Sequence, residues 1–160
     1  MIETPKPFAN RYICLATHPF TDCVDGTRDL VIRKKNLPKT QIIPLLNHHE
    51  YETDPLGFVE LAFIPCGEIS DTEELCVVTG LIATDKELLP NQCVSIGAPI
   101  DRVIGNYQIY SEITELSIVD KGHLNGAAII EFESWNNVIR ALYESAPAIV
   151  MKILKDLSYA

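Results

Sequence analysis

The stretch Gly57-Phe-Val-Glu-Leu-Ala-Phe-Ile64 places bulky apolar residues at alternate positions. Successive side chains of an extended chain point to opposite faces, so Val59, Leu61 and Phe63 share one face. Phe58 makes the opposite face apolar as well, which is typical of a strand in a closed or covered sheet. The stretch therefore predicts a strand that is buried on both faces.

Similar runs precede and follow this stretch, each rich in β-branched residues and bounded by turn-forming ones. They cover residues 11–16, 29–33, 41–48, 75–82, 93–97, 106–111, 113–119 and 127–133. This succession predicts a mainly β (α+β) fold, built as a β-barrel or sandwich, with the β core over about residues 10–133.

The hydrophobic period changes after residue 133. Apolar residues recur at helical spacing behind Ser134, a suitable N-cap, and a second stripe follows Pro147, which ends or kinks the first helix. The first stripe consists of Trp135, Val138, Ile139, Leu142 and Tyr143, and the second of Val150, Ile153, Leu154 and Leu157. The pattern predicts two C-terminal helices over about residues 134–158. The second stripe either joins two copies in a homodimer or docks on the chain's own β core.

Composition limits the classes of function. The chain has 160 residues, of which 47% are hydrophobic, and this suits a single domain over residues 1–160. Its net charge of −9 repels a phosphate backbone, so nucleic acid is a poor partner. The sequence has neither a signal-peptide h-region nor a membrane-spanning run, so we expect the protein inside a cell and away from membranes. Five cysteines without a CxxC pair predict reduced core residues rather than disulfides or a zinc knuckle.

Two histidines stand at the end of an apolar run in the segment Pro44-Leu-Leu-Asn-His-His-Glu50. An imidazole at the rim of a sheet can take and return a proton near neutral pH, which makes His48 and His49 candidate general bases. The alternatives are two solvated loop histidines or a metal site. A metal site needs further ligands, and only His18, His123 and scattered carboxylates are available, so we expect none.

A serine lies within the apolar segment Cys93-Val-Ser-Ile-Gly-Ala-Pro99. Because Gly97 has no Cβ, a substrate carbonyl can approach Ser95, and the N–H of Gly97 is a candidate oxyanion donor. The segment is not the G-x-S-x-G elbow of α/β-hydrolases, because position 93 is cysteine. Ser95 is thus a candidate nucleophile if a base lies beside it, and otherwise a structural serine.

A carboxylate interrupts the apolar run of residues 113–119. Burial of Glu115 is costly unless the carboxylate has a partner, and a histidine ring is a natural one. Alternation places Glu115 on the same face as Ser117. In the other interpretation Glu115 points to solvent from an edge strand, and His123 is the rival third member of the site.

These segments, in this order, resemble those of the prohead (capsid-maturation) serine proteases of tailed bacteriophages, which are related in fold to the herpesvirus assemblins. Residues 44–50 resemble the histidine segment of that family, and residues 94–97 resemble its nucleophile motif. Residues 115–119, with Asn125 and Ala127 after them, resemble a later strand and turn of the family.

The resemblance implies a herpesvirus-protease-like β-barrel and a serine endopeptidase with Ser95 as nucleophile, His49 as base and Glu115 orienting the imidazolium. No cofactor is implied. The implied substrates are scaffold and capsid proteins, and the enzyme itself, within an assembling viral procapsid in the host cytoplasm. The alternative is a catalytically inactive relative that serves as a structural or assembly protein of the capsid.

His48 is the alternative base. If the strand continues through both histidines, only one of the two rings faces Ser95. Counting from Pro44, as the family-like run suggests, selects His49, whereas the Asn47-His48 pair read literally selects His48.

Overall fold

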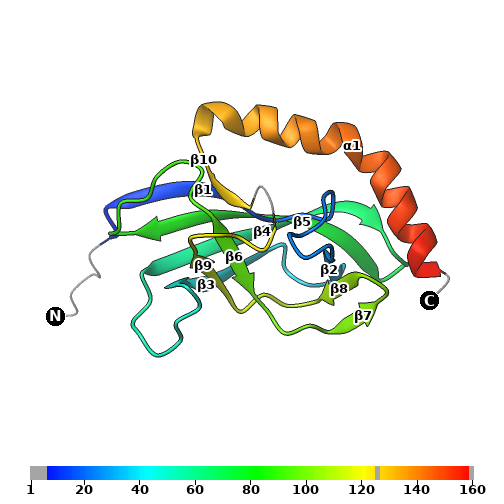
Figure 1. The fold of residues 1–160 in the computed structure, drawn as a ribbon, viewed down its shortest axis with the longest axis horizontal. Coiled ribbons are helices and arrows are strands. Elements are labelled where there is room, and N and C mark those ends of the chain that lie inside the picture. The colour runs from blue at the N-terminus through cyan, green and yellow to red at the C-terminus, as the bar shows by residue number, and fades with distance from the viewer. Residues whose placement is uncertain (1–6, 125–126, 159–160) are drawn as a thin grey trace.

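The computed structural model describes residues 7–124 and 127–158 as a β-sheet with one long helix (Figure 1). Asn125 and the N-terminal residues 1–6, both used in the sequence analysis, lie outside this part of the chain. The elements are β1 (Asn10–Thr17), β2 (Arg28–Lys34), β3 (Thr40–Asn47), β4 (Gly57–Glu68), β5 (Glu73–Thr84), β6 (Val94–Gly97), β7 (Arg102–Ile104), β8 (Tyr107–Tyr110), β9 (Glu115–Ile118), β10 (Ala128–Ile130) and α1 (Phe132–Ser158). The predicted mainly β fold is confirmed.

The strands form one open, mixed sheet. Its order is β6-β9-β3-β4-β5-β2-β8-β7, and β1 pairs with both β5 and β10. Within the described residues, β2–β8 and β3–β9 are the parallel pairs, and the other pairs are antiparallel. The pairing of β3 with β9 positions the candidate site, because it brings the end of β3 close to β6 on the other side of β9.

Every strand predicted from the sequence is found, although several ends differ and β10 stops at Ile130. Strand β7 was not predicted. It has three residues, and Arg102 and Val103 are exposed, so it carries no alternating apolar pattern that the sequence analysis could detect.

Strand β4 is not buried on both faces along its whole length. Val59, Leu61 and Phe63 belong to the core, as expected, but Phe58 is 46% exposed. The ring of Phe58 meets that of Phe8 at a centroid distance of 6.1 Å, which covers this face only locally. The prediction that both faces are buried is therefore wrong for the first part of the strand, whereas Ile64 and Cys66, further along the same face, are partly buried against the cluster that includes α1.

The helix α1 arches over one side of the sheet (Figure 1). Its residues Val150 and Ile153 are buried in one hydrophobic cluster with Leu30, Ile32 and Leu75 of β2 and β5. The second apolar stripe is thus docked on the protein's own sheet, which was one of the two alternatives. The stripe therefore provides no argument for a homodimer.

The two predicted helical segments are joined in α1, which continues through Pro147 and bends along its length (Figure 1). Pro147 has no N–H to donate to the carbonyl of Tyr143, and such a missing bond bends a helix when packing holds both of its halves. The helix begins at Phe132, ahead of the predicted N-cap Ser134. Among the described residues, no helix combines the length and the hydrophobicity required to cross a bilayer.

All five cysteines are free, and Cys14, Cys23 and Cys76 are buried. This agrees with the prediction that they are mostly reduced core residues.

Replacement of Ile153 by alanine tests the docking of α1. Ile153 is fully buried, so Ile153→Ala should lower the free energy of unfolding by about 2–5 kcal/mol, as measured by urea denaturation. The matched control is Met151→Ala on the exposed side of the same helix, which should change it by less than about 0.5 kcal/mol. Equal effects of the two substitutions would contradict the docking.

Candidate active site

Three neighbouring strands, β6, β9 and β3, carry the predicted catalytic residues. In the antiparallel pair of β6 and β9, Ser95 lies opposite Ser117 and Gly97 lies opposite Glu115. Directly opposite residues share a face of the sheet and have Cβ atoms about 4.5–5.5 Å apart. Ser95 is therefore on the same face as Glu115, and β3 ends beside them at Asn47, which pairs with Ile118.

The carboxylate of Glu115 is buried, with 1% of the residue exposed, and it has several polar partners. Its Oε1 lies 2.5 Å from Nδ1 of His49 and accepts a hydrogen bond from the hydroxyl of Tyr51 at 3.2 Å. Its Oε2 accepts a hydrogen bond from Oγ of Ser117 at 2.8 Å. The acid thus does not point to solvent, and the histidine that it contacts is His49.

The two histidines lie in a turn rather than in the strand. Strand β3 ends at Asn47, and both His48 and His49 have positive φ angles, of 48° and 58°. The N–H of His48 donates to the carbonyl of Ile118 at 2.9 Å, and the N–H of His49 donates to Oγ of Ser117 at 2.9 Å. The strand predicted over residues 41–48 therefore ends one residue too late, and the argument from alternating faces does not apply.

The turn directs the two imidazoles to different partners. His49 contacts the buried Glu115, whereas Nε2 of His48 lies 3.6 Å from Oδ1 of Asp120, whose side chain is 95% exposed. A left-handed conformation costs a residue other than glycine about 1–3 kcal/mol, and such strain is concentrated at functional sites. Here the hydrogen bonds of the turn and the contact between His49 and Glu115 hold both histidines in the left-handed conformation.

Ser95 and His49 line the same surface depression of about 520 Å³, together with His48, Asp120 and His123. In the described part of the chain, no hydrogen bond joins the Ser95 hydroxyl to either histidine. Catalytic hydrogen bonds are often long in unliganded enzymes and tighten when substrate binds. The arrangement therefore places the candidate nucleophile and the candidate base at one opening without a hydrogen bond between them.

Gly97 has a different role from the one predicted. A Cβ atom at this position would lie 1.8 Å from Oε1 and 2.4 Å from Cδ of Glu115. The space beside Gly97 is thus filled by the buried carboxylate and is not left for a substrate carbonyl. Glycine is required here because the carboxylate packs directly on the backbone.

A second polar cluster lies on another side of Ser95, and the sequence analysis did not find it. A cavity of about 120 Å³ is lined by Thr17, Asp29, Ser95, Tyr110 and His123, among others. His123, the rival third member of the site, does not contact Glu115: its Nε2 lies 3.8 Å from Oδ1 of Asp29. Burial raises the pKa of Asp29, and the nearby His123 opposes this rise.

Asp29 had a detectable signal in the sequence. It directly precedes the apolar residues Leu30, Val31 and Ile32, so its burial follows from the argument that was applied to Glu115. In contrast, no pattern in the sequence indicated that the thiol of Cys23 lies beside Asp29. It is buried beside Asp29, and burial raises its pKa to about 12.

Of the histidines considered as possible metal ligands, His18 lies apart from the depression that His48, His49 and His123 line. His18 is buried, and its Nδ1 accepts a hydrogen bond from the N–H of Phe20 at 3.1 Å. Burial, reinforced by the charge of Arg28, lowers its pKa to about 4. His18 therefore acts as a neutral acceptor within the fold, apart from His48 and His49.

Comparisons with protein-family models, with curated proteins and with solved structures found no match to this chain. The functional argument therefore depends on the geometry of the site and on the resemblance of its motifs.

Substitution of Gly97 tests the packing of the Glu115 carboxylate. The added methyl group of Gly97→Ala displaces the carboxylate, and we expect a loss of about 1–3 kcal/mol in the free energy of unfolding, measured by urea denaturation. Gly122→Ala is the control, because its Cβ would meet nothing nearer than 3.4 Å. A Gly97→Ala variant as stable as the unaltered chain would contradict the close approach of Glu115.

Proposed function

We propose that the protein is a serine endopeptidase in which Ser95 is the nucleophile, His49 the general base and Glu115 the residue that orients the base. The observation that carries this proposal is the contact of 2.5 Å between His49 and the buried Glu115, at the rim of the depression that Ser95 lines. A buried carboxylate that holds one nitrogen of a half-exposed imidazole is the arrangement that acyl transfer by a serine requires.

In the proposed reaction, Oγ of Ser95 attacks the scissile carbonyl carbon while Nε2 of His49 accepts the hydroxyl proton. The resulting imidazolium donates its Nδ1–H to Glu115, whose negative charge stabilises it. The tetrahedral intermediate collapses as His49 returns the proton to the leaving amine, which gives an acyl-enzyme. Water, deprotonated by the same imidazole, then hydrolyses the ester and restores Ser95.

The choice of His49 over His48 rests on the partner of each ring. Nδ1 of His49 is engaged by Glu115, so Nε2 is the nitrogen left for proton transfer. Among the residues that the structure describes, the charged partner of the His48 ring is Asp120, which is almost fully solvated and therefore stabilises an imidazolium weakly.

The substrate class follows from the motif resemblance: scaffold and capsid proteins, and the enzyme itself, within an assembling procapsid in the host cytoplasm. One feature of the sheet supports the proposed relation to the assemblin barrel. The N–H of Val94 donates to the carbonyl of Ala127 and the N–H of Ile129 to that of Gln92, each at 3.0 Å. These bonds bring β10 beside the start of β6, and this local contact between the two ends of the series β6, β9, β3, β4, β5, β1 and β10 is what supports the proposed relation.

A structural or assembly protein of the capsid without catalytic activity is the second candidate. The observation that favours it is the lack of a hydrogen bond between Ser95 and His49 in the described part of the chain. Such a protein would keep the fold and the buried Glu115, but its serine would not be activated.

Labelling with a fluorophosphonate distinguishes the two candidates without knowledge of the substrate. The reagent reacts with serines that a base activates, so we expect one adduct per chain, on Ser95, as determined by peptide mass spectrometry. Ser95→Ala should abolish the adduct, whereas the exposed control Ser70→Ala should keep it. A folded chain that forms no adduct would favour the structural protein.

The rate of the same labelling reaction identifies the base. His49→Ala should slow it by about 10²- to 10⁴-fold, because general base catalysis contributes an effect of this size. His48→Asn should leave the rate nearly unchanged, and asparagine tolerates the left-handed conformation at position 48. If only the change at position 48 slows labelling, the base has been assigned to the wrong histidine.

A further inference from the structure

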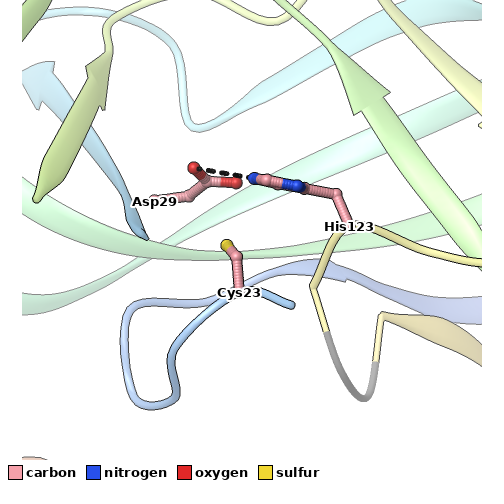
Figure 2. Close-up of side chains that lie close together, drawn as sticks. All are labelled: Cys23, Asp29 and His123. Carbon is pink, nitrogen blue, oxygen red and sulfur yellow. Dashed lines mark ion pairs between the residues drawn. The ribbon is translucent and has the colours of Figure 1, made fainter. Parts of the chain in front are cut away.

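We propose that Cys23, Asp29 and His123 bind a divalent transition metal ion of the zinc class. The candidate ligand atoms of these three residues lie within 4.8 Å of one another. Figure 2 shows the three side chains directed toward a common point, with the contact between Asp29 and His123 marked. The site is separate from His49 and Glu115, and its existence does not depend on peptidase activity.

The buried carboxylate of Asp29 is the observation that favours a cation at this place. Asp29 is 4% exposed, and its Oδ1 has no hydrogen-bond partner among the described residues. A buried acceptor without a partner is costly, and a charged one is more so. His123 lies 3.8 Å away, which is beyond hydrogen-bond distance, so it does not satisfy the oxygen.

The identity of the three ligands favours zinc over calcium or magnesium. A thiolate and an imidazole are the donors that zinc prefers, whereas calcium and magnesium take oxygen ligands. A thiolate, a carboxylate and a neutral imidazole together carry a charge of −2, which a divalent ion neutralises. The bound ion would thus compensate the negative charges of Cys23 and Asp29 inside the protein.

The geometry is close to that of a tetrahedral site. Metal–ligand bonds of about 2.0–2.3 Å place the ligand atoms of such a site about 3.3–3.8 Å apart. The separation of 3.8 Å between Asp29 and His123 is at the upper end of this range, and the limit of 4.8 Å for the whole set requires a contraction of no more than about 1.5 Å.

Main-chain contacts hold the three ligands together, although they come from distant parts of the chain. Cys23 forms a β-bridge with Leu124, and the N–H of Val24 donates to the carbonyl of His123 at 2.9 Å. Asp29 lies in β2, where pairing with β8 fixes its position. The ligand set is thus preorganised by the backbone.

The cavity of about 120 Å³ that Asp29 and His123 line offers room for a fourth ligand. Oγ1 of Thr17 lines the same cavity and, like Oδ1 of Asp29, has no hydrogen-bond partner among the described residues. A water molecule bound to the metal would supply that partner. Three protein ligands and one water form the usual coordination of an open zinc site.

Metal titration of the full chain tests the proposal. After treatment with a chelator, the protein should bind one Zn²⁺ per chain in isothermal titration calorimetry. Bound Co²⁺ should show the thiolate charge-transfer band in the near ultraviolet, because one ligand is the sulfur of Cys23. Cys23→Ser, Asp29→Asn and His123→Ala should each raise the Kd more than about tenfold, since even residues that only orient a ligand change metal affinity about 10- to 100-fold.

Two control variants exclude other sites. Cys66→Ser removes a half-buried thiol in β4, and His48→Asn removes the histidine next to Asp120. Neither should change the Kd. A folded chain that binds no Zn²⁺, binding that survives all three ligand substitutions, or binding that His48→Asn abolishes would overturn the proposal.

If a ligand variant fails to fold, a measurement on the unaltered chain tests whether Cys23 is a ligand of the bound zinc. X-ray absorption of the zinc-loaded protein should show one sulfur neighbour together with nitrogen or oxygen neighbours. A first shell without sulfur would exclude Cys23 and overturn the site.

Discussion

The burial of the Glu115 carboxylate is the constraint on which the rest of the site depends. A carboxylate inside a protein needs partners at both oxygens, because its desolvation is otherwise not compensated. Ser117 bonds to Oε2, and His49 and Tyr51 contact Oε1. The carboxylate also takes the space beside Gly97, so that one buried acid determines the residue required in the adjacent strand β6.

The same constraint explains the strained turn after β3. His49 reaches Glu115 only because the chain leaves the strand at Asn47 and adopts left-handed conformations at two consecutive positions. The hydroxyl of Ser117 stabilises this turn, since it accepts from the N–H of His49 and donates to Glu115. Ser117 therefore joins the backbone of the turn to the acid, while Ser95 lies opposite it on β6.

The sequence predicted the strands well because most have long runs of apolar or β-branched residues. It failed where local pattern and burial diverge: β7 has no such run, and Phe58 is apolar but faces water at the uncovered side of an open sheet. Whether a second layer covers a face depends on the arrangement of distant elements. Alternation along one strand does not contain this information.

The candidate site could be predicted where a polar residue lies in an apolar strand, because a buried polar group needs a partner. An acid in an apolar strand predicted a partner for Glu115, and the geometry brings His49 to it. The same reasoning applies to Asp29, which directly precedes three apolar residues, but the loops that bring Cys23 and His123 beside it are fixed by main-chain bonds between distant segments. No spacing along the chain indicates those bonds.

Two buried acids thus lie near Ser95, each facing a histidine, and their hydrogen bonding separates their roles. Both oxygens of Glu115 have partners, so its negative charge is already compensated by hydrogen bonds and can stabilise a positive charge that forms on His49 during a reaction. Asp29 has an oxygen without any partner among the described residues, and a thiol lies next to it. A cation bound beside this oxygen would supply the missing partner. The first arrangement suits transient proton transfer and the second a resident metal ion, which is why we propose catalysis for one histidine and metal binding for the other.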